Sequence, residues 1–265
     1  MELILKKGKK KTKYTIPTQW NELTLGRYMR LMKVLKSDEK IHEIEKIVRI
    51  LNCLTDVPKR QFYGLDMPSI NKLSDHLSKF LNTEAEQTLT TFINVNDIEY
   101  GFHPKLVDMT LGEFVDLETY MKDINENLHL IMSVLYRPVI AKEEDGTYAI
   151  EDYEPNEEVA NLFKKELTLK EFNGASVFFL RFREGTFNTF SQIFNKEEED
   201  EESNERSSEI NEKYGWYNTI YHLAGENILN IEKVVKKSAY ECLTFLAYTQ
   251  DINKKRQDEY RRYKV

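Results

Sequence analysis

The chain has 265 residues, of which 40% are hydrophobic and 31% are charged, and its formal net charge is −7. The apolar fraction is large enough to bury a core, which excludes a protein that is disordered from end to end. Ten Gly and six Pro are too few for a loop-rich all-β sandwich or propeller, and the length suits one large domain or two small ones.

Positive charge is concentrated at the two ends of the chain. Residues 1–13 carry six Lys against one Glu, a net charge of +5. Residues 254–265 carry a net charge of +4, which leaves −16 for the residues between the two ends. We therefore expect basic ends on an acidic body, available to an acidic protein partner or to nucleic acid.

Residues 1–20 are expected to form a basic N-terminal arm or hairpin. Two short apolar pieces, at residues 2–5 and 14–16, flank the lysines, and Gly8 lies between them. This pattern predicts a β-hairpin with a basic tip. The alternative is an extended basic arm that folds on a partner.

Residues 21–195 are expected to form the main domain, in which helices predominate. Apolar residues recur with helical spacing from Leu25 to Leu35 and from Ile41 to Leu54, and Pro68 marks the start of a third helix. Further helices are predicted at residues 111–123, 126–136, 157–167 and 169–194.

Two β-hairpins are predicted within this domain, near residues 90–103 and 139–150. The first places residues 90–95 against 98–103 around Asn96-Asp97. The second places residues 139–142 against 148–150 around Asp145-Gly146, a dipeptide that favours a type I′ turn.

An acidic block separates the main domain from the end of the chain. Seven acidic residues lie between positions 197 and 205, so residues 196–208 are expected to be a solvated linker. Residues 209–265 are expected to be a helical segment with a basic tail, whose last helix starts at Ile231 and ends in charged residues after Asp251. The predicted fold class is mainly α with small β-hairpins (α+β), an aromatic-rich helical bundle in two blocks joined by the acidic linker.

A short pattern typical of a helix start recurs three times. Each copy places an apolar residue before a threonine that is positioned to be an N-cap, and these threonines are Thr24, Thr110 and Thr168. Glu113 and Glu171 follow their threonines by three residues and complete capping boxes, whereas Arg27 does not. The separations between the copies are unequal, which favours convergent use of a good helix start over a solenoid or an ancient duplication.

The sequence contains no recognisable catalytic constellation. It lacks the Gly-rich phosphate loops, the nucleophile elbow and the zinc-protease motif. Cys53 and Cys242 are far apart and are expected to be reduced core residues. The five histidines are scattered: His42, His76, His103, His129 and His222. We therefore predict no catalytic residue, no cofactor, no metal site and no enzymatic activity.

Protein–protein binding is the expected activity, because aromatic-rich amphipathic helices suit it. One face of the aromatic stretch at residues 172–194 is expected to be open to a partner, and the lysine-dense arm can contact phosphate without reading bases. The predicted partner-binding residues are Lys6, Lys7, Lys9, Lys10, Lys11, Lys13, Phe178, Phe182, Phe190, Arg261 and Arg262.

Several segments resemble proteins encoded in the structural gene regions of tailed bacteriophages, including phages of Bacteroidetes. They are residues 99–104 (EYGFHP), 108–117 (DMTLGEFVDL) and 130–138 (LIMSVLYRP). Residues 214–224 (YGWYNTIYHLA) and 241–248 (ECLTFLAY) are similar to the helical end of phage tail-assembly chaperones and related morphogenesis proteins. The resemblance implies a non-enzymatic part in virion assembly.

The expected function is therefore that of a phage structural or morphogenesis protein that binds other virion proteins, as a neck, tail, portal-associated or internal component. One alternative is a tail-assembly chaperone that is not retained in the virion, and another is a nucleic-acid-associated regulatory protein that uses the basic arm. The implied location is the virion, or the host-cell cytoplasm during assembly, without secretion or membrane contact. Non-specific contact with packaged DNA and homo-oligomers in the particle are compatible with this role.

Overall fold

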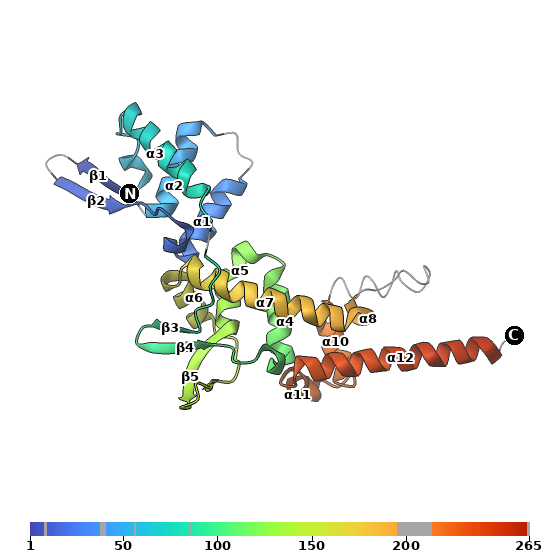
Figure 1. Ribbon diagram of the computed structural model, residues 1–265. Coiled ribbons are helices and arrows are strands. Elements are labelled where there is room, and N and C mark those ends of the chain that lie inside the picture. The colour runs from blue at the N-terminus through green and yellow to red at the C-terminus, as the bar shows by residue number, and fades with distance from the viewer. Residues whose placement is uncertain (8–9, 38–40, 56, 85, 195–213, 264–265) are drawn as a thin grey trace. The chain divides into compact units, whose positions relative to one another are not determined.

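The computed structural model describes residues 1–7, 10–37, 41–55, 57–84, 86–194 and 214–263. Within them the chain is mainly α-helical and has two small antiparallel sheets, which confirms the expected fold class (Figure 1). The chain divides into two compact units. Unit 1 comprises Met1–Phe102 and Tyr120–Phe178, and unit 2 comprises His103–Thr119 and Phe179–Val265.

This division differs from the expected one, in which a linker at residues 196–208 separates residues 21–195 from 209–265. Residues 103–119 and 179–194 belong with the C-terminal helices in unit 2. The reason is shared burial, because Leu111 packs in one apolar cluster with Ile220 and Cys242. The expected acidic linker lies outside the described residues.

Unit 1 begins with an antiparallel hairpin of β1 (Glu2–Lys7) and β2 (Lys10–Thr15). The hairpin, and not the extended arm, is therefore the conformation of this segment. Its open end is closed by the chain terminus: the Met1 ammonium donates to the Ile16 carbonyl at 2.7 Å, and the Ile16 N–H donates to the Met1 carbonyl at 2.8 Å. Leu3 and Ile16 are buried, which anchors this end of the hairpin to the unit.

The helices of unit 1 largely follow the predicted apolar periodicity. Helix α3 starts as the sequence indicates, with Asp66 as N-cap accepting from the Ser69 N–H at 3.0 Å and with Pro68 in the first turn. The elements are η1 (Trp20–Glu22), α1 (Leu25–Lys36), α2 (Glu43–Thr55), η2 (Lys59–Gln61), α3 (Met67–Leu81), α5 (Ile124–Leu135), α6 (Glu157–Glu166) and, as far as Phe178, α7 (Leu169–Thr189).

The two hairpins predicted near residues 90–103 and 139–150 both form, and they join into a single sheet. The strands are β3 (Phe92–Val95), β4 (Ile98–Phe102), β5 (Tyr136–Lys142) and β6 (Tyr148–Ile150), in the order β3-β4-β5-β6. Strand β5 starts directly after α5, earlier than expected, because Tyr136 and Arg137 pair with the end of β4.

The two hairpin turns differ. Asn96 and Asp97 both have positive φ, +50° and +62°, as a type I′ turn requires. The type I′ turn predicted at Asp145-Gly146 is wrong. There only Gly146 has positive φ, its N–H donates to the Glu143 carbonyl at 3.1 Å, and the loop is a type I turn followed by a glycine bulge. Asp145 instead accepts from the Thr147 N–H at 2.9 Å.

Unit 2 is helical and buries two apolar clusters. One contains Leu111, Ile220 and Cys242, and the other contains Leu243 and Phe190. Its elements are η3 (Leu106–Asp108), α4 (Leu111–Met121) as far as Thr119, the last part of α7, α8 (Ser191–Phe194), α10 (Trp216–Leu223), η4 (Ile228–Asn230), α11 (Ile231–Val235) and α12 (Ala239–Tyr263).

Two of the predicted helices have other boundaries in the structure. The helix predicted over residues 169–194 ends at Thr189 and resumes at Ser191, and Phe190 between them is buried. The last helix does not run on from Ile231, because α11 ends at Val235 and α12 starts at Ala239. Nor does it end near Asp251: α12 remains helical through the charged residues to Tyr263.

Two of the three predicted N-caps use their side chains. The Thr110 N–H donates to Glu113 Oε2 at 2.7 Å, and the Glu113 N–H donates back to Thr110 Oγ1 at 3.2 Å. The Lys170 N–H donates to Thr168 Oγ1 at 3.3 Å, and the Thr168 N–H donates to Glu171 Oε2 at 2.9 Å. Thr24 makes no side-chain cap bond, so the prediction for its hydroxyl is wrong. Position 27 carries arginine, which cannot complete a capping box.

Candidate functional site

Large apolar side chains are exposed on several C-terminal elements of unit 2. Ile228 and Leu229 lie side by side in η4 and are 75% and 79% exposed. Tyr217 on α10 is also exposed. Exposed apolar groups of this size are typical of surfaces that contact other proteins.

Helix α12 contributes to the core of unit 2 only over its first three turns. Ala239, Cys242, Leu243 and Ala247 are buried on its inner face. Beyond Thr249 the helix continues as the long red segment that ends near the C-terminus (Figure 1), and its residues 251–263 are exposed except for a half-buried Ile252. The predicted partner-binding residues Arg261 and Arg262 lie in this exposed part.

The three predicted aromatic residues of α7 and its continuation have different surroundings. Phe178 in unit 1 is exposed and meets the edge of the Phe102 ring at 6.3 Å between centroids. In unit 2, Phe182 is half-buried beside Phe179. Phe190 is buried against Leu243, so packing within unit 2 accounts for this ring.

The predicted basic site at the N-terminus is only partly described. Lys13 is exposed and pairs with Glu2 at 2.5 Å. The strand register places Lys6 opposite Lys11 and Lys7 opposite Lys10, although their side chains lie outside the described part, as does all of Lys9.

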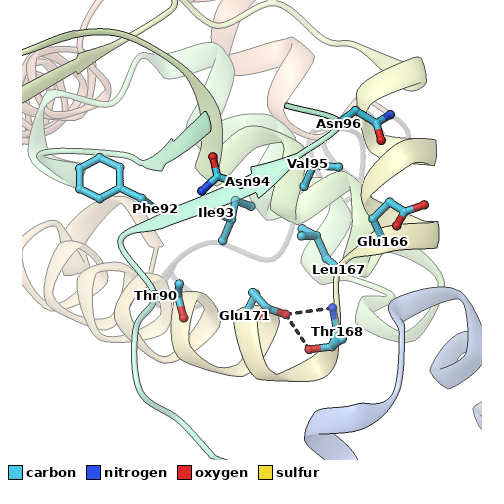
Figure 2. A pocket seen from close by; sticks show the side chains of 10 residues that line it. All are labelled: Thr90, Phe92, Ile93, Asn94, Val95, Asn96, Glu166, Leu167, Thr168 and Glu171. Atoms are coloured by element: carbon cyan, nitrogen blue, oxygen red, sulfur yellow. Dashed lines mark hydrogen bonds between the residues drawn. The ribbon is translucent and has the colours of Figure 1, made fainter. Parts of the chain in front are cut away.

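A cleft of about 380 Å³ runs along β3 in unit 1. No local pattern in the sequence predicts it. Figure 2 shows β3 on one side and the junction of α6 and α7 on the other, with Ile93 and Leu167 directed into the space between them. The lining residues are Thr90, Phe92, Ile93, Asn94, Val95, Asn96, Glu166, Leu167, Thr168 and Glu171.

The cleft offers hydrogen-bonding groups of a sheet edge beside an apolar floor. In the described chain β3 pairs only with β4, and the Phe102 N–H donates to the Thr91 carbonyl at 2.8 Å. Because hydrogen-bonded pairs alternate along an antiparallel ladder, the backbone groups of Phe92 and Asn94 point away from β4. Such an edge is suited to hydrogen-bonding an extended chain.

The carboxylate in this cleft has a structural role. Glu171 Oε2 accepts from both the N–H and the hydroxyl of Thr168, at 2.9 and 2.6 Å (Figure 2). Glu166 is exposed to solvent. A carboxylate that is engaged as a helix cap is not poised for proton transfer, so Glu171 has a structural role here.

A second, more apolar cleft of about 330 Å³ lies elsewhere in unit 1. Tyr28 lines it, and its hydroxyl donates to Asn125 Oδ1 at 3.4 Å. Burial raises the pKa of Tyr28. The other lining residues are Trp20, Met32, Thr83, Ile124, Leu128, Leu169, Phe172 and Asn173.

Buried ionisable groups occur mainly in structural pairs. His103 Nε2 lies 3.7 Å from Glu113 Oε1, and both side chains are buried. Glu118 accepts two hydrogen bonds from Arg183, from Nε at 2.5 Å and from Nη2 at 2.9 Å. Both cysteines are buried thiols outside any disulfide, and burial raises the pKa of the Cys242 thiol, which disfavours the reactive thiolate.

Three comparisons with known proteins place the chain in no family. No protein family, no curated protein and no solved structure matches it significantly. Among the described residues, no cluster of three or more His, Cys, Asp or Glu side chains has a metal-binding arrangement. No helix in the same part of the chain combines the length and hydrophobicity that crossing a bilayer requires.

The start of α12 was not predicted, although the sequence carries the pattern of a helix start there. Ser238 and Glu241 have the Ser-x-x-Glu spacing of a capping box, and α12 begins directly after Ser238. The Glu241 N–H donates to Ser238 Oγ at 3.4 Å. The β3 cleft, in contrast, depends on long-range packing and has no local signature.

Proposed function

We propose that this chain is a non-enzymatic structural or morphogenesis protein of a tailed bacteriophage, and that it acts by binding other proteins of the virion. The observation that carries the proposal is the exposure of Ile228 and Leu229 in η4. They lie between the two segments, residues 214–224 and 241–248, that resemble phage tail-assembly proteins. An apolar pair that the chain's own unit leaves in solvent gains free energy when a partner covers it.

The local structure holds this pair in place. The Asn227 side chain accepts from the Leu229 N–H at 3.0 Å and caps η4. The Asn230 side chain donates to the Ala224 carbonyl at 3.1 Å, which ties the turn back to the end of α10. A fixed apolar turn loses little conformational entropy on binding, so it is suited to be an anchor for a partner.

Mass spectrometry of purified virions from the phage that encodes the chain tests the role. Detection at a stoichiometric copy number supports a structural component. Detection only in assembly intermediates indicates the alternative, a chaperone that is not retained. Absence from both contradicts the proposal in either form.

The site is tested by replacing both apolar residues with serine, as Ile228→Ser with Leu229→Ser. Because both side chains are exposed, we expect the protein to fold normally and to lose its place in particles or intermediates. Lys233→Ser, an exposed polar position on α11, is the matched control and is expected to assemble like the wild type. Normal assembly of the double variant would rule out this anchor.

A second candidate is nucleic-acid binding through the N-terminal hairpin, which the opposed lysine pairs of β1 and β2 favour. Binding through phosphates predicts that the logarithm of affinity falls with the logarithm of salt concentration, with a slope of about −0.9 per phosphate contacted. Replacing Lys6, Lys7, Lys10 and Lys11 with glutamine should then flatten this slope.

A quadruple variant elsewhere provides the control for net charge. Its four positions are exposed lysines outside the hairpin: Lys105, Lys122, Lys165 and Lys170. Replacing them with glutamine changes the net charge equally and is expected to leave the salt slope unchanged. If both quadruple variants flatten the salt slope equally, the slope depends on net charge and not on the hairpin, and this candidate is rejected.

A further inference from the structure

The outer face of α12 carries a row of aromatic side chains that unit 2 leaves in solvent. Phe245, Tyr248, Tyr260 and Tyr263 are 59%, 62%, 74% and 91% exposed. Tyr248 follows Phe245 by three residues and Tyr263 follows Tyr260 by three, and Ile252 and Arg256 fill the gap between the two pairs at intervals of four residues, so all six lie on one side of the helix. With the half-buried Ile252 and the exposed Arg256 they form what we call the outer stripe: Phe245, Tyr248, Ile252, Arg256, Tyr260 and Tyr263.

The spacing of the outer stripe is the same in both directions. Its successive intervals are three, four, four, four and three residues, centred on position 254. We propose that α12 pairs antiparallel with α12 of a second copy of this chain, around a two-fold axis at the level of residue 254. Phe245 of one copy then lies opposite Tyr263 of the other, and Tyr248 lies opposite Tyr260.

Palindromic spacing is what an antiparallel pair of identical helices requires of the residues that face each other. In such an interface residue i of one copy contacts residue j of the other, and j contacts i. A partner of different sequence imposes no symmetry on the spacing of the residues that it covers. The symmetric spacing therefore favours a second copy as the occupant.

The middle of the stripe selects the antiparallel orientation. In this orientation Arg256 lies opposite Ile252, so that its aliphatic stem packs on an apolar side chain and its guanidinium can stack on a tyrosine ring. In a parallel pair, Arg256 would face its own copy at close range and the like charges would repel each other.

The size of the stripe is sufficient for association. Two copies bring eight aromatic rings together, and a Phe or Tyr side chain buries roughly 150–250 Å² when covered. Even partial burial of eight rings approaches the roughly 1,200 Å² at which specific interfaces begin.

Sedimentation equilibrium of the full chain over a range of concentrations tests the pairing. We expect a monomer–dimer equilibrium whose dissociation constant rises at least tenfold in Tyr248→Glu and in Tyr260→Glu. Both side chains are exposed, so the variants should keep the helical circular dichroism of the monomer. Gln257→Glu adds the same charge outside the stripe, about 120° around the helix axis from its mean direction, and is expected to leave the dissociation constant unchanged.

Disulfide cross-linking tests the orientation. Chains carrying Ile252→Cys mixed with chains carrying Arg256→Cys should form a disulfide-linked dimer, because these two positions face each other. Each variant alone should cross-link poorly, because in the antiparallel pair position 252 is offset along the axis from its own copy by about 6 Å, given a rise of 1.5 Å per residue.

Several results would overturn the pairing. They are a wild-type chain that stays monomeric at all concentrations, a dimer that the stripe variants leave intact, a dimer that Gln257→Glu weakens equally, and efficient cross-linking of Ile252→Cys alone. The pairing does not rest on the virion role proposed above. Loss of dimerisation with intact particle incorporation, or the reverse, therefore separates the two.

Discussion

Thr110 and Ser238 lie opposite each other in an antiparallel bridge that joins the starts of α4 and α12 in unit 2. The Leu111 N–H donates to the Lys237 carbonyl at 2.7 Å, and the Ala239 N–H donates to the Met109 carbonyl at 2.9 Å. The first amides of a helix have no partner within the helix, so each helix start satisfies one such amide of the other.

Unit 1 contains a second pair of the same kind. Thr24 and Thr168 form the bridge, and the Leu25 N–H donates to the Leu167 carbonyl at 2.9 Å. The reciprocal bond, from the Leu169 N–H to the Leu23 carbonyl, has the same length. The recurring helix start is thus used in pairs, one pair in each unit.

A pair of abutting helix starts brings two positive dipole ends together, which requires a compensating charge. In unit 2 Glu113 supplies it: the side chain is buried and caps α4. In unit 1 Glu171 does the same for α7. The glutamate of the capping box therefore has an electrostatic role in the pair as well as a hydrogen-bonding role within its own helix.

The caps can be ranked by mutation. Thr110→Ala and Thr168→Ala remove side-chain bonds at helix starts and should each lower the free energy of unfolding by about 1 kcal/mol. Thr24→Ala removes no such bond and should cost clearly less. Urea unfolding followed by circular dichroism measures the three values, and equal losses would contradict the assignment of the caps.

Two glycines of α7 should respond to alanine in opposite ways. A Cβ at Gly174 would lie 2.3 Å from the Thr88 carbonyl oxygen, so Gly174→Ala must displace backbone and should destabilise by about 1–3 kcal/mol. A Cβ at Gly185 meets nothing within 4 Å. Gly185→Ala should therefore stabilise the helix by up to about 1 kcal/mol. Thermal unfolding of both variants checks the sign, and a tolerated Gly174→Ala would mean that residues 86–91 do not pack on α7 as described.

The Glu118–Arg183 pair should contribute to the stability of unit 2. Glu118 is buried and accepts both hydrogen bonds of the guanidinium, and Glu118→Gln keeps the shape but removes the charge. We expect a loss of about 1–3 kcal/mol, since hydrogen bonds between charged groups are the stronger kind. Glu232→Gln, which breaks the solvent-exposed pair with Lys236, is the control and should leave the unfolding midpoint unchanged.

His129 should make unit 1 less stable in mild acid. Burial, with a further contribution from the nearby Lys164, lowers the pKa of His129 from 6.5 to about 4 in the folded chain. Between these values the unfolded chain binds the proton more readily, so stability is greatest above pH 6.5 and falls as the pH drops towards 4. Urea unfolding at pH 7 and pH 5 measures the effect.

His129→Gln provides the matched comparison for this pH dependence. Glutamine does not titrate, so the loss of stability between pH 7 and pH 5 should be smaller than in the wild-type chain. An identical pH dependence in both proteins would assign the effect to other groups.

Local patterns in the sequence were sufficient to predict most helices and the hairpins at residues 90–103 and 139–150. They were also sufficient for three of the four paired helix starts. Asn96-Asp97 specifies its turn through positive φ at both positions, and Thr110 with Glu113 specifies a cap within four residues. These features depend on hydrogen bonds between near neighbours. The sequence alone also correctly indicated that Arg27 completes no capping box with Thr24, because the arginine side chain offers no hydrogen-bond acceptor.

Only the tertiary structure decided which of these elements share a core. Pairing of β4 with β5 merges two hairpins into one sheet and leaves β3 as the edge that borders the cleft. Phe190, between α7 and α8, is buried, while Phe245 and Tyr248 on α12 remain exposed, although the sequence predicts a helix at all three aromatic positions. Periodicity shows that a helix has an apolar face, but whether its own chain covers that face depends on contacts between residues far apart in the sequence, and these form only when the whole unit packs.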